Sequence, residues 1–316
     1  MRTNKELTGA ILTTLGGICW GLSGSMGQYL FTRQGMDSRW LVPIRLGLAG
    51  IILLLYCSRR FGRKVLSPWQ NKTEARDLVI YGLLGVSCCQ FLYFLTIQLS
   101  TAGAATILQD LSPIMILFVS CRQAKRAPEL HEILAIALAL AGVFLITTHG
   151  TTGSVAVPLP AIVTGVLSAV CVTIYNVTPQ RLMRSYPVVL LQGWAFLMGG
   201  AASSLILRPW HFGYVPNAVG LFGIAFVVIV GNVLAFPLYI QGVKYIGPEK
   251  AILYGFSEPI SAAVVGTLFL GSPFTLFDAA GFALVFSMLA LISLGGRSSG
   301  SRSRPAFLRR PRRQAS

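Results

Sequence analysis

The sequence predicts an all-α integral membrane protein of about ten transmembrane helices, arranged as two inverted five-helix repeats. Three observations predict this fold class. Of the 316 residues, 54% are hydrophobic and only 11% are charged, whereas soluble domains carry roughly 25% charged residues. Ten apolar runs are long enough to cross a bilayer. A tyrosine and a proline also recur in one register, 146 positions apart (259 minus 113).

The ten runs lie near residues 8–31, 40–57, 78–98, 104–121, 131–148, 157–178, 187–206, 218–240, 251–270 and 276–295. The first run follows Arg2 and Lys5, as the apolar core of a signal peptide would. It has no clear small-residue cleavage site, however, and nine more runs follow it. We therefore expect a retained helix.

The repeat is visible as a set of matched positions. At an offset of 146, five residues of the first half recur in the second, namely Leu92, Tyr93, Ala105, Pro113 and Ile114 as Leu238, Tyr239, Ala251, Pro259 and Ile260. We expect a first repeat over residues 1–150, a second over 151–296, and a basic disordered cytoplasmic tail over 297–316. Because five spans is an odd number, the second copy enters the membrane in the opposite sense.

The net charge of +16 is distributed unevenly along the chain. With the N terminus inside, 22 Lys and Arg residues fall in inside segments, and only Arg33, Arg39 and Arg208 fall outside. The positive-inside rule then places both termini in the cytoplasm, for a multi-pass protein of the inner (plasma) membrane. We expect the connection from Ser58 to Asp77 to be a solvated, basic loop on this side. The charge orients the protein, so no nucleic-acid partner is predicted.

Two acids and two prolines interrupt the apolar runs. Glu258 and Pro259 lie within the ninth run, and Asp110 and Pro113 lie within the fourth. A charged group in mid-membrane costs about 2.5 to 3.5 kcal/mol, so such residues normally face a cavity or a partner. Proline removes a backbone donor and is expected to break each helix. Entering from opposite sides, the two acids should bracket the membrane midplane.

Arg45 of the second run lies at the same predicted depth as Asp110. An ion pair between the two is one reading, and removing either partner would then leave a buried, uncompensated charge. The other reading is that the arginine side chain extends outward to the membrane surface. Trp20, too deep for an interfacial belt, either lines a cavity or packs in the core.

These features resemble the drug/metabolite transporter superfamily, in particular its ten-helix EamA-type branch of bacterial inner-membrane carriers. The resemblance covers about residues 7 to 296 and rests on Trp20 with Gly21, Arg45, the Pro113 segment, and Ser257, Glu258 and Pro259. It implies a carrier that moves small metabolites, often exporting amino acids or related compounds, through a cavity between two halves. The family commonly ends its fourth and ninth helices with a Gly-Glu pair. Here Arg122 or Gln123, and then Ser272, stand in place of the glutamates.

We therefore expect a secondary transporter, an exporter of small metabolites that works by alternating access. The predicted cavity walls are Trp20, Gln90, Tyr93, Asn232, Tyr239 and Tyr254. Glu258 is the coupling candidate, since burial disfavours the charged form of a carboxylic acid and a proton could be exchanged against an amine-bearing substrate. The alternative is a permanently hydrogen-bonded structural acid beside a proline kink.

Other functions remain as alternatives. Within transport, the second candidate is an uptake carrier or exchanger for a nucleotide sugar or other organic anion, with Arg45 binding substrate. A passive channel or a membrane scaffold is a further alternative. No HExxH, paired-aspartate, Ser-His or nucleotide-loop pattern is present, so we expect no enzyme, no metal site and no cofactor. The expected partners are a small-molecule substrate and the lipid bilayer, with the oligomeric state left open.

Overall fold

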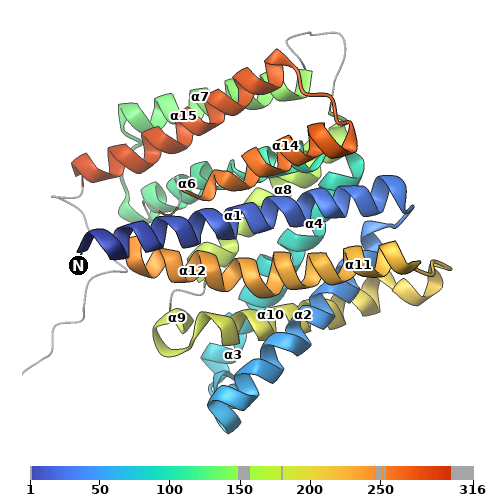
Figure 1. Ribbon diagram of the computed structural model, residues 1–316. Coiled ribbons are helices and arrows are strands. Elements are labelled where there is room, and N and C mark those ends of the chain that lie inside the picture. Colours follow the sequence, from blue (N-terminus) through green and yellow to red (C-terminus); the bar gives the residue numbers. More distant parts are fainter. Residues whose placement is uncertain (1, 149–156, 179–180, 247–250, 252–253, 300–316) are drawn as a thin grey trace, which may run out of the picture.

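The computed structural model describes residues 2–148, 157–178, 181–246, 251 and 254–299, and all regular elements in these ranges are helical. The helices are α1 (Arg2–Arg33), α2 (Ser38–Phe61), η1 (Gly62–Trp69), α3 (Lys72–Val79), η2 (Ile80–Ser87), α4 (Cys88–Leu99), α5 (Ala102–Gln109), α6 (Ser112–Ala124), α7 (Leu130–Thr148), α8 (Leu159–Val177), α9 (Leu182–Ser185), α10 (Val188–Leu207), η4 (Pro209–His211), α11 (Ala218–Phe226), η5 (Val227–Leu234), α12 (Ala235–Ile246), α14 (Ser257–Leu270) and α15 (Leu276–Ser299). Helices α1, α12, α14, α7 and α15 run side by side in nearly parallel or antiparallel directions, and α2 crosses obliquely to them (Figure 1). The predicted all-α fold is confirmed.

Each of the ten predicted runs corresponds to an apolar helical stretch. Among the described residues, seven stretches are long and apolar enough to cross a membrane, and three shorter apolar helices occupy the remaining positions, Leu130–Ile146, Ser257–Leu270 and Leu276–Leu291. The start of α1 and the end of α15 lie at the same end of the bundle (Figure 1). We call this the N-terminal end and the opposite one the distal end.

Helix boundaries repeat along the chain. α2 ends at Phe61 and α10 at Leu207, while α7 begins at Leu130 and α15 at Leu276, so each pair is separated by 146 residues (207 minus 61, 276 minus 130). A π-helical stretch, η2 and then η5, also occurs in each half. The paired helices α7 and α15 lie side by side and run in opposite directions (Figure 1). The repeat is therefore present in the structure as well as in the sequence.

The fourth and ninth runs are broken, but not in the way the sequence predicted. Asp110 and Leu111 separate α5 from α6, and a turn at Phe256 precedes α14. Pro113 and Pro259 each lie in the first turn of the helix that follows. A backbone N–H in a first turn has no helical acceptor in any case, so proline is tolerated there. The breaks thus precede the prolines, which begin new helices instead of disrupting existing ones.

The connection from Ser58 to Asp77 is also different from the prediction. It is largely helical, since α2 continues into η1 and α3 follows after two residues. Trp194 of α10 donates a hydrogen bond from Nε1 to the Val65 carbonyl at 2.9 Å. Its ring also meets Trp69 edge to face, with centroids 5.3 Å apart. These contacts hold one side of the connection against the bundle. Its helical content was not predicted, whereas most of its side chains are exposed, as expected.

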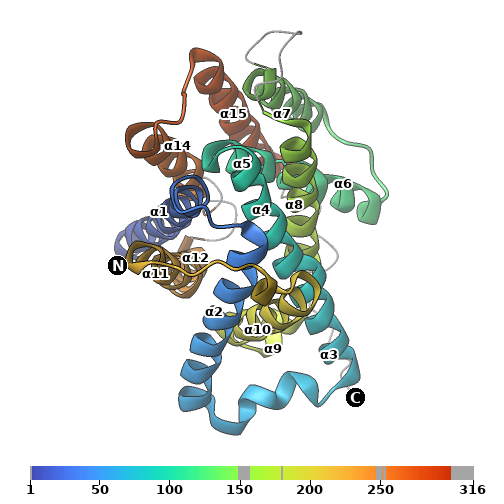
Figure 2. The same cartoon turned by 90° about the vertical axis from the view of Figure 1, so that its right-hand side faces the viewer.

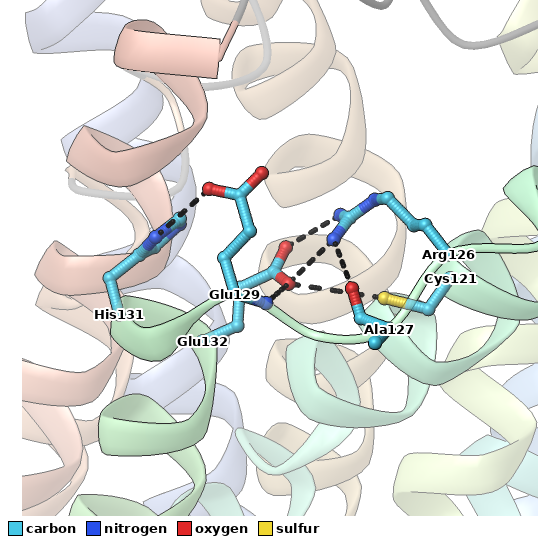
Figure 3. Close-up of polar contacts among 6 residues, drawn as sticks. All are labelled: Cys121, Arg126, Ala127, Glu129, His131 and Glu132. Carbon is cyan, nitrogen blue, oxygen red and sulfur yellow. Dashed lines mark hydrogen bonds and ion pairs between the residues drawn. The ribbon is translucent and has the colours of Figure 1, made fainter.

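An acid fixes the start of the last helix in each half. Arg126 donates to both carboxylate oxygens of Glu132, at 2.7 and 2.8 Å, and the Glu129 N–H donates to the same group at 2.7 Å (Figure 3). The bonds to Glu132 raise the pKa of the Arg126 guanidinium. In the second half, Asp278 accepts from the N–H and hydroxyl of Thr275. These acids orient α7 and α15, although the preceding helices lack the glutamates that the family commonly has.

The small residues of α1 allow close contact with other helices. A Cβ atom at Gly17 would overlap Ser257, and one at Gly21 would overlap Ser261 and the Glu258 carbonyl. α1 therefore packs closely against the first turn of α14. This contact places α14 directly beside α1, which separates it from α12 (Figure 1).

Candidate functional site

A pocket lies at the centre of the bundle, where α1, α2, α4, α12 and α14 meet. We call it the central pocket. It is lined by Trp20, Ser23, Gly24, Arg45, Val86, Cys89, Gln90, Tyr93, Phe94, Gln109, Tyr175, Phe236 and Glu258. Five of the residues selected from sequence are thus brought together in it, namely Trp20, Arg45, Gln90, Tyr93 and Glu258.

A second pocket adjoins the first and extends toward the N-terminal end. We call it the vestibule, and it shares Trp20, Gln109, Tyr175, Phe236 and Glu258 with the central pocket. It adds three predicted residues, Asp110, Pro113 and Tyr239, and reaches Met183 and Val188 beside α9 and the start of α10. About 230 Å³ of it is open to water-sized molecules. Together the two pockets form a polar space large enough for a small metabolite.

Arg45 is the cation of the central pocket. Its Nη2 donates to Oδ1 of Asn232, and its guanidinium carbon lies 3.8 Å from the centre of the Phe94 ring. The residue is only 2% exposed, and Nε and Nη1 have no hydrogen-bond partner among the described residues. Two donors are therefore free to bind an anionic group.

Neither predicted reading of Arg45 matches this geometry. No ion pair between Arg45 and Asp110 is present in the part of the chain that the structure describes. The side chain does not reach the surface either. The physical reason is that Arg45 faces Asn232 of η5 and the Phe94 ring of α4, which both contact the guanidinium inside the bundle. A cation–π contact of this kind is strengthened when the pair is removed from water.

The two acids meet at the vestibule. Asp110 lies in the break between α5 and α6, and Glu258 lies in the first turn of α14. Both line the vestibule, and Oδ2 of Asp110 is buried without a hydrogen-bond partner among the described residues. The Tyr93 hydroxyl beside the central pocket is likewise buried and unpartnered there. Two carboxylates in one low-dielectric space repel each other, so a proton or a cation is favoured there.

Three selected residues lie outside the pocket linings. Asn232 is fully buried and contacts Arg45, so it positions the guanidinium. Tyr254 is 41% exposed and lines neither pocket. In a continuous helix, Tyr254 and Glu258 would lie on one face because they are four residues apart. The turn at Phe256 interrupts the helix between them, so the two side chains do not share a face. Pro259 is buried in the first turn of α14.

Sequence reasoning did not select three residues that line both pockets, Gln109, Tyr175 and Phe236. Trp20 contacts Phe236 edge to face, with centroids 5.1 Å apart, and Tyr239 at 5.0 Å. Gln109 could have been selected from the sequence, because Thr106, Gln109 and Pro113 in the fourth run are spaced three and four residues apart, as on one face of a helix. For Phe236, an aromatic residue in an apolar run, no sequence signal distinguishes a cavity wall from a lipid-facing position.

The side chain of Gln28 in α1 lies toward the distal end of the bundle, where it lines a further pocket of about 320 Å³ together with Ser272. Its Nε2 donates to the Ser272 hydroxyl at 2.7 Å, and its Oε1 accepts from the Ala102 N–H at 2.8 Å. One turn deeper, the Ser25 hydroxyl donates to the Ala262 carbonyl at 3.4 Å. Gln28 is only 4% exposed. It therefore links α1 to α5 and to the turn after α14.

The chain matches the EamA-like transporter family twice, over residues 7–148 and 159–294. It belongs to this family. YicL of Salmonella typhimurium, an uncharacterized inner membrane transporter, is 34% identical over 92% of this chain and 96% of that protein. YyaM of Bacillus subtilis, an uncharacterized transporter, is 24% identical over 80% and 82%, respectively. A crystal structure with 18% identity aligns with a TM-score of 0.61 over 94% of this chain and 100% of the other, so the fold is shared.

This EamA-family member is thus a multi-pass membrane transporter. The two family matches follow the repeat seen in the helix boundaries. In the bundle, the matched halves contribute Asp110 and Glu258 to a common vestibule. Candidate substrate contacts therefore come from both halves.

Proposed function

We propose that this EamA-family transporter is a secondary transporter that exports a small metabolite with both a carboxylate and an amine, such as an amino acid or a related compound, by alternating access. One observation carries the proposal. Adjoining pockets contain a buried cation with two unpartnered donors and two half-buried acids, between aromatic walls.

The chemistry of the pockets matches both charges of such a molecule. Arg45 offers the N–H groups of Nε and Nη1, which lie on different sides of the guanidinium, and a charge-assisted hydrogen bond from either one can hold a carboxylate oxygen. Asp110 and Glu258 offer carboxylate oxygens to a protonated amine. Trp20 and Tyr239 would pack against the remainder of the molecule. Because a buried polar group without a partner is costly, a ligand that satisfies these groups gains affinity.

The export direction follows the family resemblance, and the structure adds the side from which substrate would enter. The vestibule extends toward the N-terminal end, whereas on the distal side Gln28 links α1 to α5 and to Ser272. We place the N-terminal end in the cytoplasm because of the positive-inside rule, and the protein in the inner membrane, as the name of YicL says of that relative. Substrate would enter from the cytoplasm between the halves formed by residues 1–150 and 151–296, with residues 297–316 as a cytoplasmic tail.

Coupling to protons is assigned to Glu258. The protonated amine of the substrate and a proton would compete for the negative charge of Glu258. Export of one substrate molecule would therefore be exchanged for the entry of a proton. The test is substrate-driven proton flux in liposomes with Glu258→Gln, which keeps the shape of the side chain and removes its charge. Asp77→Asn is the control, because Asp77 is paired with the exposed Arg76. Coupled flux that survives in Glu258→Gln would refute this role.

An organic anion, such as a nucleotide sugar, is the second candidate substrate. It is favoured by Arg45, whose unpartnered donors form no ion pair with an acid among the described residues. Thermal-shift titration of the purified protein separates the two, since a ligand that binds only the folded state raises its stability. Binding of an anion that is lost in Arg45→Ala but survives in Asp110→Asn favours this candidate. An amino acid should require both residues.

A further inference from the structure

The connection between α2 and α3 carries a strongly basic surface. We call residues 59–76 the basic segment. Its exposed cations are Arg59, Arg60, Arg63, Lys64, Lys72 and Arg76. Figure 2 shows the chain leaving α2 and returning through α3 at the lower edge of the bundle. The segment therefore extends away from the central pockets.

Most of this charge is uncompensated. Asp77, next to the segment, pairs with Arg76 at 3.3 Å, and Glu74 within it accepts a hydrogen bond from the Tyr186 hydroxyl at 2.7 Å. Within the described chain, Arg63 and Lys64 have no acidic partner. Both are exposed on the short helix η1. A ligand with a negative charge would find two adjacent free cations here.

Apolar side chains lie beside these cations on the same short helix. Leu66 is 55% exposed and Trp69 is 36% exposed, while Val65 is buried against the bundle. Trp194 fixes the backbone through its bond to the Val65 carbonyl and its contact with the Trp69 ring. Cations next to partly exposed Leu and Trp are typical of helices that lie at the membrane interface.

We propose that the basic segment is a binding site for anionic phospholipid, with the phosphate headgroup on Arg63 and Lys64 and the acyl chains beside Leu66 and Trp69. A free phosphate would account for the cations but not for the exposed apolar side chains. Because η1 is held on α10, its cations are already arranged before lipid binds, which lowers the entropic cost of binding.

The experiment uses the full chain in mild detergent, titrated with phosphatidylglycerol or phosphatidylcholine that carries brominated acyl chains. Bromine quenches tryptophan fluorescence at contact, and Trp69→Phe identifies the part of the signal that comes from Trp69. We expect tighter binding of phosphatidylglycerol. Removing two cations in Arg63→Gln/Lys64→Gln should weaken that binding about thirtyfold. The matched control, Arg33→Gln/Arg208→Gln, removes two exposed cations at the distal end and should leave it unchanged.

Several outcomes would overturn the proposal. These are equal binding of both lipids, an equal loss in the two double variants, and displacement of the lipid by soluble glycerol phosphate at the same concentration. A wild-type preference that does not weaken as the salt concentration rises would also overturn it, because exposed charges are screened. This last measurement needs no variant and so does not depend on the folding of one.

Discussion

Gln28 allows a quantitative test of alternating access. Its side chain makes two buried hydrogen bonds, to the Ser272 hydroxyl and from the Ala102 N–H. Gln28→Leu keeps a similar volume and removes both bonds. A buried hydrogen bond contributes about 0.5 to 1.5 kcal/mol net, so the closed distal end should lose about 1 to 3 kcal/mol. If both bonds exist only in this state, the equilibrium shifts about 5- to 150-fold toward distal opening.

The assay measures access to Ser25, which lies one turn below Gln28 and is 2% exposed. In a background without the six native cysteines, Ser25→Cys is labelled with a membrane-impermeant thiol reagent from the distal side. We expect the cysteine at position 25 to be labelled about 5- to 150-fold faster in the Gln28→Leu background than with glutamine at position 28. Gln34→Leu is the control, since the hydrogen bond that Gln34 donates goes to the Tyr29 hydroxyl, five residues earlier in the chain, and links no separate helices.

Equal labelling rates with leucine and with glutamine at position 28, in variants that keep the same thermal transition, would refute the reasoning. In that case the bonds of Gln28 would persist in both states of the transporter. The distal closure would then have to be sought in the contact between Ser25 and Ala262 or elsewhere.

Two further predictions concern stability. Gly21→Val should lower the melting temperature markedly, because its side chain would overlap Ser261 of α14, whereas Gly47→Val should have little effect, since no atom lies within 4 Å of the place that a Cβ atom would take there. Asp37→Ala removes the N-cap of α2 and should cost about 1 kcal/mol at neutral pH. Burial alone raises the pKa of Asp37, but hydrogen bonds from Arg39 outweigh it and the pKa lies below its ordinary value. The stabilisation by the Asp37 carboxylate is therefore present above the pKa of Asp37 in the unfolded state. It is lost as the pH falls through the pKa of Asp37 in the folded state, so the unfolding curves of wild type and variant should converge in acid.

Much of the fold follows from hydropathy alone, because a span requires about 20 apolar residues and the alternation of spans and turns then sets the topology. The breaks were harder to place. Pro113 and Pro259 marked the right regions, but the sequence does not show that the regular helix is interrupted at Asp110 and at Phe256, before each proline. The helical content of η1 was missed because its stability depends on α10, a contact that local sequence does not encode.

The candidate site was predictable in its polar members only. Arg45 and Glu258 are conspicuous because a charge in an apolar run is costly. The partner of Arg45 was not predictable, since Asn232 is distant in sequence and its direction depends on the π-helical turn of η5. Tyr254 was placed in the cavity by a helical phase that the turn at Phe256 interrupts. The partner of Arg45 and the facing direction of Tyr254 thus depend on local helix geometry that the sequence does not show.

The turns that follow α6 and α14 have the same backbone geometry in the two halves, but they bond to different partners. Lys125 and Gly271 both end their helices at positive φ, 51° and 67°, and lie 146 residues apart (271 minus 125). The next residue is Arg126 in one half, which bonds within its own repeat, and Ser272 in the other, which is bonded by Gln28 of the first repeat. The turn at the N-terminal end thus forms its hydrogen bonds within one half, while the distal turn is hydrogen-bonded to the other half. In the proposed alternating-access cycle, opening the distal end would break the contact between Gln28 and Ser272, whereas opening the N-terminal end would leave the contacts of Arg126 intact.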